Sequence, residues 1–163
     1  MQKVPITAYG HRRLQEQLHK LKVQDRPRII NAIAEARAHG DISENAEYDA
    51  AREEQAFAEA KINEIENLLA RSEVIDPTRI SSHIAVFGCT VELLNVDNDE
   101  TVVYCVVGDP EAVPEKNLVG LSTPIARAIL GREVGDEIKV RAPGGDQEFE
   151  ITEIRYVEIP FED

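Results

Sequence analysis

The sequence is poor in aromatic and sulfur-containing residues: it has no tryptophan, one methionine and two cysteines, and 5% of its 163 residues are aromatic. Cys89 and Cys105 have no other Cys or His at the spacing of a zinc site. We therefore expect two buried, reduced cysteines. The four histidines are scattered and form no metal-binding pair, so we assign none of them a catalytic role.

Long hydrophobic runs are lacking as well, although 42% of the residues are hydrophobic. No run approaches the length of a signal-peptide core or of a membrane span. We therefore expect a folded protein of the cytoplasm that makes no membrane contact. Its length is enough for one ordinary domain or two small ones.

Positive charge is in short supply, and it is unevenly distributed. The chain carries 18 basic and 31 acidic residues, a net charge of −13. Residues 1–75 hold 11 basic and 13 acidic residues, which leaves 7 and 18 for residues 76–163. Because nucleic-acid phosphates repel an acidic surface, we expect the second half to meet a basic patch on a protein partner, and only the first half to approach nucleic acid.

The first half predicts an antiparallel coiled-coil hairpin over residues 1–76, with its tip at residues 40–48. Two series of residues recur at the spacing of one helix face. The first series is Leu14, Leu18, Leu21, Ile29, Ile30 and Ile33, and the second is Ala51, Gln55, Ala58, Ile62, Ile65, Leu69 and Ser72. Pro27 predicts a kink in the first helix, with Asp25 as a candidate cap of the restarted segment. Gly40 suits the C-terminal cap.

The second half predicts a small β-rich domain. Asp76-Pro77 is expected to end the second helix, and we place a linker at residues 77–83 and the domain at residues 84–163. Two hairpin turns are indicated, at residues 97–99 and 143–146. Between them a short helix is expected, with Ser122 or Thr123 as its N-cap and Pro124 at its first position. The fold class is therefore α+β.

The stretch "HGDISENAEYDAA" at the hairpin tip holds four carboxylates and no Lys or Arg. One interpretation is a capping box of Asp41 and Glu44. A helix of about 30 residues rises roughly 45 Å, however, and capping gives no reason to carry acids so far from a core. The other interpretation is half a magnesium site, because Mg²⁺ is commonly held by one or two carboxylates with waters and phosphates. A partner with a deep active site would supply the rest.

Several segments together resemble the bacterial Gre transcript cleavage factors of the GreA type. They are "RPRIINAIAEARAHGDISENAEYDAAREEQAFAEAKI", "VIDP", "VFGCTVELL", "STPIARAILGREVGDEI" and "PGG". The resemblance runs from about Pro5 to Tyr156, and the GD-x-x-ENAEY tip is its most specific part. It implies a coiled coil that enters the secondary channel of RNA polymerase and an FKBP-like domain, residues 84–163, that docks at the channel entrance.

The resemblance also implies residue roles. Asp41 and Glu44 would help to hold a Mg²⁺ ion shared with the polymerase active site and to activate the attacking water, and the free protein would bind no metal. Arg37, Arg52 and Tyr48 would contact the RNA 3′ segment. We expect docking on polymerase through Ser122, Thr123, Pro124 and Ile125, because a capped short helix presents an exposed, rigid edge and the surrounding half of the chain is strongly acidic.

The expected function is transcription elongation control by a monomer that stimulates the polymerase to cleave the 3′ end of backtracked RNA. It would act in trans, without being a nuclease itself. One alternative is a channel-binding regulator that does not stimulate cleavage, and a more distant one is a coiled-coil adaptor or chaperone. The sequence departs from the family pattern at Asp49, at Ala60-Lys61, at Val113 and at Val119-Gly120, which concerns details of docking.

Overall fold

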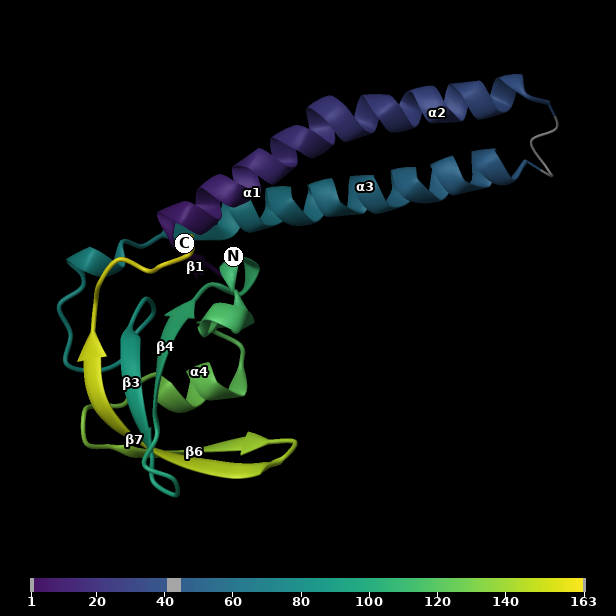
Figure 1. Ribbon diagram of the computed structural model, residues 1–163. Helices are drawn as coiled ribbons and strands as arrows, with labels where there is room; N and C mark the ends of the chain where they lie inside the picture. Colours follow the sequence, from purple (N-terminus) through teal and green to yellow (C-terminus); the bar gives the residue numbers. More distant parts are fainter. Residues whose placement is uncertain (1, 41–44, 163) are drawn as a thin grey trace. The chain divides into compact units, whose positions relative to one another are not determined.

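The computed structural model describes residues 2–40 and 45–162 (Figure 1). By its internal contacts the chain divides into two compact units. One contains His11–Ser72. The other combines Lys3–Gly10 with the residues from Glu73 onward. Residues 3–10 thus group with the later part of the chain, which a division near residue 76 did not anticipate.

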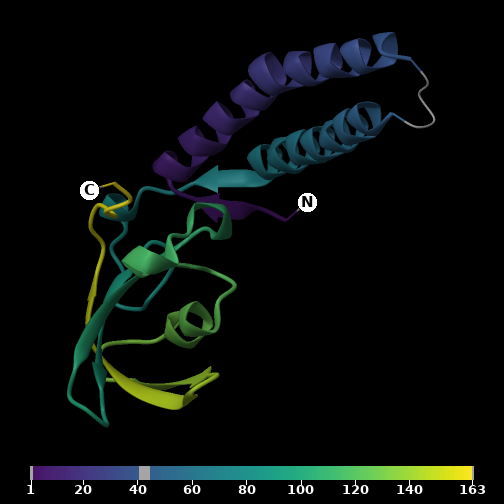
Figure 2. The same ribbon diagram turned by 45° about the vertical axis from the view of Figure 1, so that its right-hand side comes forward.

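The first unit is a helical hairpin, as the heptad spacing predicted. Its two long arms run side by side in Figures 1 and 2. The arms are built from α1 (Ala8–Lys20), a π-helical turn η1 (Leu21–Asp25), α2 (Arg26–Ala38) and α3 (Ala46–Arg71). Ile29, Ile33, Ala51 and Ala58 form a buried cluster between α2 and α3. Apolar burial along this seam stabilises the pair of helices.

The interruption predicted at Pro27 is the π-helical turn η1. A proline has no N–H to donate to the carbonyl four residues before it. Just before Pro27, the Arg26 N–H donates to the carbonyl of Leu21, five residues back. This wider turn adds one residue, so that Leu21 and Ile29, eight positions apart, both pack on the same cluster.

Three details of the predicted helices are wrong. Asp25 has helical backbone angles and its side chain forms no capping hydrogen bond, because the chain stays helical through η1. Ile30 is 52% exposed, since it lies beside the seam that Ile29 and Ile33 occupy. The second long helix ends at Arg71, before Asp76-Pro77, because residues 72–74 form a strand.

The second unit is built on a five-stranded sheet with the strand order β5-β4-β3-β7-β6. Its neighbours are antiparallel except for β4 and β5. The strands are β3 (Thr90–Asn95), β4 (Thr101–Val107), β5 (Leu118–Gly120), β6 (Glu137–Ala142) and β7 (Gly145–Arg155). Both predicted hairpin turns are confirmed, between β3 and β4 and between β6 and β7.

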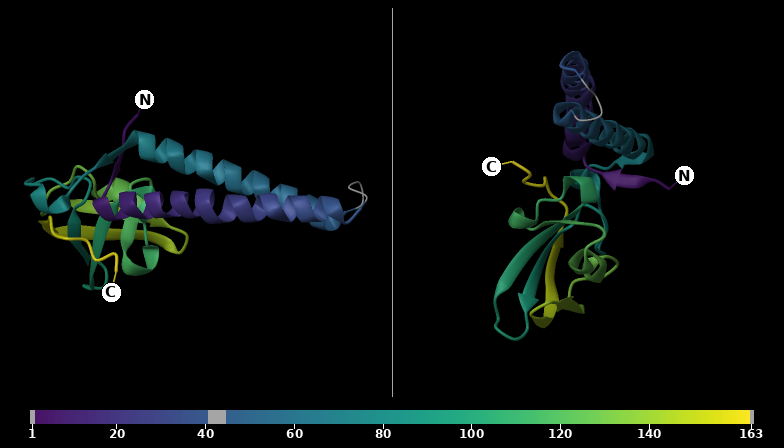
Figure 3. Two further views of the ribbon diagram at one scale, coloured as in Figure 1. Left: turned by 90° about the horizontal axis from the view of Figure 1, so that it is seen from above. Right: turned by 90° about the vertical axis from the view of Figure 1, so that its right-hand side faces the viewer.

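Helix α4 (Pro124–Ile129) lies against one face of this sheet, as Figures 1 and 3 show. Ala126 and Ile129 are fully buried in a cluster with Val91, Val106 and Ile151. The helix begins as predicted, with Pro124 at its first position and the Thr123 side chain as its N-cap. Cys89 and Cys105 are buried and unbridged. Burial raises the pKa of Cys89 to about 12, which makes this thiol inert.

Smaller elements complete the second unit. A two-stranded sheet pairs β1 (Val4–Ile6) with β2 (Ser72–Val74), and the Ile75 N–H donates to the Ile6 carbonyl. Three short 3₁₀ turns follow along the chain: η3 (Pro77–Arg79), η4 (Asp109–Glu111) and η5 (Pro114–Lys116). The first lies between β2 and β3, and the other two lie between β4 and β5.

Candidate functional site

The hairpin turn is bounded by two well-defined helix ends. Helix α2 ends at Ala38, and Gly40 follows with a φ of +124°, a backbone angle that favours glycine. The expected Gly40 cap is therefore confirmed. Helix α3 begins at Ala46, with Asn45 as its N-cap. The predicted metal ligands Asp41 and Glu44, and the capping box proposed for them, lie outside the described residues.

Asn45 connects the two helix ends through its side-chain amide. Its Oδ1 accepts a hydrogen bond from the Tyr48 backbone N–H at 3.1 Å, which caps α3. Its Nδ2 donates to the Ala36 carbonyl in the last turn of α2, at 2.6 Å. One side chain thus satisfies an end group of each helix. This role was not predicted from the sequence, although an Asn just before a helical run is a typical N-cap signal.

Arg37 and Tyr48 meet across the same helix ends. The guanidinium carbon of Arg37 lies 5.7 Å from the centroid of the Tyr48 ring, within the range of a cation–π contact. Tyr48 is half-buried against the seam cluster, while Arg37 is exposed. Arg52 is exposed on α3 and forms no ion pair with another described residue. The structure therefore brings Arg37 and Tyr48 together, and it pairs Arg52 with no acid among the residues that it describes.

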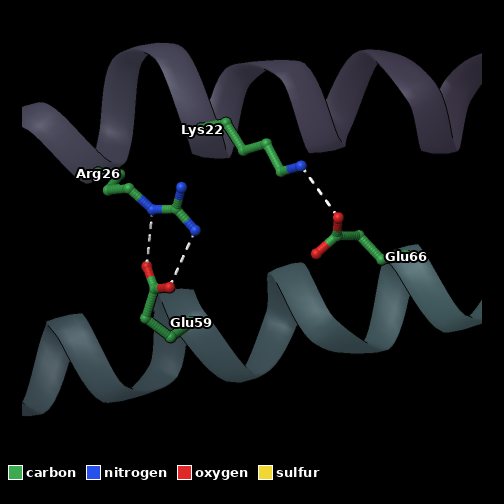
Figure 4. Close-up of polar contacts among 4 residues, drawn as sticks. All are labelled: Lys22, Arg26, Glu59 and Glu66. Carbon is green, nitrogen blue, oxygen red and sulfur yellow. Dashed lines mark hydrogen bonds and ion pairs between the residues drawn. The ribbon is translucent and has the colours of Figure 1, made fainter.

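Farther from the turn, basic side chains of the first arm are paired with glutamates of α3. Figure 4 shows Arg26 and Lys22 meeting Glu59 and Glu66. Arg26 donates two parallel hydrogen bonds to Glu59, each of 2.9 Å, and Lys22 Nζ lies 3.0 Å from Glu66 Oε2. Arg28 forms the corresponding pair with Glu54.

These pairs form a cross-helix ion ladder, by which we mean Lys22–Glu66, Arg26–Glu59 and Arg28–Glu54. The hydrogen bond from Arg26 lowers the pKa of Glu59, and the one from Arg28 lowers the pKa of Glu54. Both glutamates are therefore charged and offset the arginines beside them. The ladder offsets the positive charge of Lys22, Arg26 and Arg28, which lie away from the turn. Arg37 and Arg52, near the turn, have no such partner among the described residues.

The predicted docking residues lie at the start of α4, and only part of the set faces outward. Ser122 and Pro124 are exposed, whereas Thr123 and Ile125 are half-buried. The Thr123 hydroxyl accepts from the Ala126 N–H at 3.3 Å and donates to the Gly120 carbonyl at 2.8 Å. The Ser122 backbone N–H donates to Asp109 Oδ1 at 3.0 Å. This edge is rigid, and its outward groups are Ser122 and Pro124.

Glu111 is a buried carboxyl group that the sequence analysis did not single out. It is 6% exposed and accepts hydrogen bonds from the backbone N–H groups of Thr7 and Gly108 and from the Thr7 hydroxyl. Burial raises the pKa of Glu111, and the hydrogen bonds oppose that shift. These bonds attach Lys3–Gly10 to the sheet unit, so Glu111 has a structural role.

The described parts of the chain, residues 2–40 and 45–162, contain no cluster of three or more His, Cys, Asp or Glu side chains placed to hold a metal ion. No helix among them is both long and apolar enough to cross a membrane.

The hairpin and the sheet unit each match a family model of transcription elongation factors. The family model described as "Transcription elongation factor, N-terminal" matches residues 4–74, and "Transcription elongation factor, GreA/GreB, C-term" matches residues 81–156. The chain therefore belongs to the GreA/GreB family of transcription elongation factors.

Similar proteins include the transcription elongation factor GreA of Halorhodospira halophila, 52% identical over 96% of this chain and 99% of that protein. GreA of Paracoccus denitrificans is 50% identical over 96% of this chain and 100% of that protein. Among solved structures, the GreA factor homolog 1 of Thermus thermophilus is 26% identical with a TM-score of 0.44, covering 94% of this chain and 99% of that chain.

Proposed function

We propose that the protein stimulates RNA polymerase to cleave the 3′ end of backtracked RNA, with the hairpin inside the polymerase secondary channel. The observation that carries this proposal is the distribution of charge along the hairpin. Arg37 and Arg52 flank the turn without an acidic partner among the described residues, whereas the ion ladder neutralises basic groups farther down. Arg37 and Arg52 thus keep positive charge available to RNA phosphates near the turn whose sequence contains Asp41 and Glu44.

The chemistry of the donor set fits a magnesium ion. Asp41 and Glu44 supply carboxylate oxygens, the ligand class that Mg²⁺ prefers, and two of them suffice when a partner contributes the rest. When bound in the polymerase site, the ion would lower the pKa of a water and offset charge on the scissile phosphate. Asp41 and Glu44 would orient that water from the hairpin side, while Arg37 and Arg52 attract the RNA backbone and Tyr48 supports Arg37.

The partners of this function are RNA polymerase and the RNA 3′ segment, and we propose that the protein acts on them as a monomer in the cytoplasm. The bond would be broken in the active site of the polymerase. A regulator that occupies the channel without stimulating cleavage needs no defined carboxylate pair at the turn. Variants of Asp41 and Glu44 therefore distinguish a factor that stimulates cleavage from one that only occupies the channel.

The test compares stalled elongation complexes with and without the protein. We expect RNA shortening only when polymerase and protein are both present. Asp41→Asn and Glu44→Gln should each lower the cleavage rate by about tenfold or more while polymerase binding is retained, as expected when a metal ligand is removed. Glu47→Gln is the matched control, because Glu47 is an exposed acid in the first turn of α3 outside the assigned pair.

Three results would contradict the proposal. Cleavage of free RNA by the protein alone would make it a nuclease. Equal cleavage by wild type and both variants would favour the non-cleaving regulator. A loss of the same size in Glu47→Gln would show that overall negative charge matters at the turn, rather than the pair.

A further inference from the structure

We propose that Asn45 is a positioning residue, which connects the ends of α2 and α3 and so fixes the anchor points of the chain that carries Asp41 and Glu44. The inference rests on the proposed function and deepens it. Asn45 lies at the C-terminal end of the turn, and its partner, the Ala36 carbonyl, lies before the N-terminal end. Both ends of residues 37–44 are therefore held by one side chain.

Capping alone does not explain an asparagine at position 45. Ser, Thr and Asp cap helices about as well, since the cap requires only an oxygen acceptor for the Tyr48 N–H. Ionised Asp has no hydrogen to donate, and Ser and Thr have a single hydroxyl instead of a separate acceptor and amide donor. The 2.6 Å hydrogen bond from Asn45 Nδ2 to the Ala36 carbonyl is thus the feature that distinguishes Asn from the other capping residues.

The Ala36 carbonyl is in the last turn of α2, where carbonyl groups have no partner farther along the helix. It accepts the His39 N–H at 3.3 Å and the Asn45 amide at 2.6 Å. The Arg37–Tyr48 contact crosses the two helices at the same level. Two independent contacts therefore join α2 to α3 at the base of the turn.

Fixed anchor points matter because cleavage depends on placing two carboxylates accurately. Joining the ends of a short segment removes many of its conformations before it binds. A displacement of about 1 Å in a reacting group can lower a rate by about a hundredfold. Breaking the Asn45–Ala36 hydrogen bond should therefore lower the rate of the chemical step more than the affinity for polymerase.

Two substitutions separate this role from capping. Asn45→Ser keeps an oxygen for the Tyr48 N–H and removes the amide group that donates to Ala36, leaving one hydroxyl on a shorter side chain. Asn45→Asp also keeps the cap but places a negative oxygen opposite the Ala36 carbonyl. For each, we expect the maximal cleavage rate at saturating protein to fall by about tenfold or more, with the half-saturating concentration within about twofold of wild type. The Mg²⁺ concentration needed for half-maximal cleavage should rise.

Helix content measured by circular dichroism should stay at the wild-type level in both variants. Arg26→Gln is the matched control, because it removes an interhelical contact of the ladder far from the turn. It should leave the maximal rate unchanged. In the free protein, amide hydrogen exchange at His39 should be faster in Asn45→Ser than in wild type, since the shared acceptor Ala36 is less well held.

The inference is overturned if both Asn45 variants keep the wild-type maximal rate. This includes the case in which only the half-saturating concentration rises, because that change concerns affinity for polymerase. A wild-type protein that stimulates no cleavage contradicts the proposed function instead. In that case the exchange measurement still decides whether Asn45 fixes the helix ends, and unchanged exchange at His39 would refute it.

Discussion

Gly10 leaves room for the buried carboxyl group of Glu111. A Cβ atom added at Gly10 would lie 2.3 Å from Glu111 Oε1 and 2.9 Å from Glu111 Cβ. Neither atom is free to move, because the carboxyl group is held by Thr7 and Gly108. Close packing, rather than an unusual backbone angle, therefore requires glycine at this position.

We predict that Gly10→Ala destabilises the protein by about 1–3 kcal/mol, the usual cost of overpacking a buried site. The direction of the change in stability is informative. Gly10 lies in α1, where the higher helix propensity of alanine would by itself stabilise the protein. Urea unfolding of the full chain measures the change. Gly144→Ala serves as control, since nothing lies within 4 Å of its added Cβ. Equal or greater stability of Gly10→Ala would show that the Glu111 side chain shifts at little cost to make room for the added methyl group.

At the scale of elements, the ion ladder determines how much positive charge α2 and η1 present. Its pairs are partly exposed, with side chains of Arg26 and Glu59 38% and 46% accessible. Pairs of this kind contribute little to stability. Their effect on the local potential is larger, because each glutamate lies within a Debye length of roughly 8 Å from the cation it neutralises.

We predict that the wild-type protein releases mainly short fragments, about two or three nucleotides, because carboxylates repel RNA that extends past Arg37 and Arg52. Replacing Glu54, Glu59 and Glu66 by Gln together should free the three cations of the ladder and lengthen the released fragments. End-labelled RNA from backtracked complexes measures fragment size. Lys61→Gln, on the exposed face of α3, is a control that should not lengthen them.

The start of α4 gives a prediction on docking. Ser122 is exposed, and its backbone N–H keeps its bond to Asp109 whatever side chain it carries. If the acidic half meets a basic surface of polymerase, Ser122→Arg should weaken binding by about tenfold through like-charge repulsion. Wild-type affinity should fall as salt rises.

Gln147→Arg adds the same charge at an exposed position of β7 and should bind polymerase like wild type. Equal affinities of wild type, Ser122→Arg and Gln147→Arg would show that the start of α4 does not meet the polymerase. Equal weakening by both variants would point to the total charge of the domain rather than to this edge.

At the scale of the whole molecule, residues 3–10 and the segment after the last strand belong to one packed unit. Ile159 and Phe161 are buried with Cys105, Val107 and Leu118, although the family model ends at residue 156. The ring of Phe161 stacks on Tyr9 with centroids 4.4 Å apart. The segment after the last strand is therefore part of the core of the sheet unit.

Phe161→Ala should accordingly destabilise the protein by about 3–5 kcal/mol, the typical cost of removing a buried phenylalanine ring. Val157→Ala, at a 42% exposed position of the same segment, should change stability by no more than about 0.5 kcal/mol. Thermal unfolding of the full chain measures both. If the two variants unfold alike, the terminal segment contributes nothing to the core.

The sequence by itself determined the features that depend on neighbouring residues. The seam of α3, the turns of the two β-hairpins, a helix cap at Ser122 or Thr123 and the glycine after α2 all follow from periodicity or backbone preference within a few positions. The acidic turn was found in the same way. Such features are encoded locally, so they can be inferred before any contact is known.

Only the tertiary structure decided which groups meet across long stretches of chain. Arg26 and Glu59 are 33 positions apart, and Thr7 and Glu111 are 104 positions apart. The register between α2 and α3, set by packing and by the extra residue of η1, selects the ladder and the Asn45–Ala36 contact. Local patterns do not fix such a register, because the free energy of each pairing depends on every other contact along the two helices.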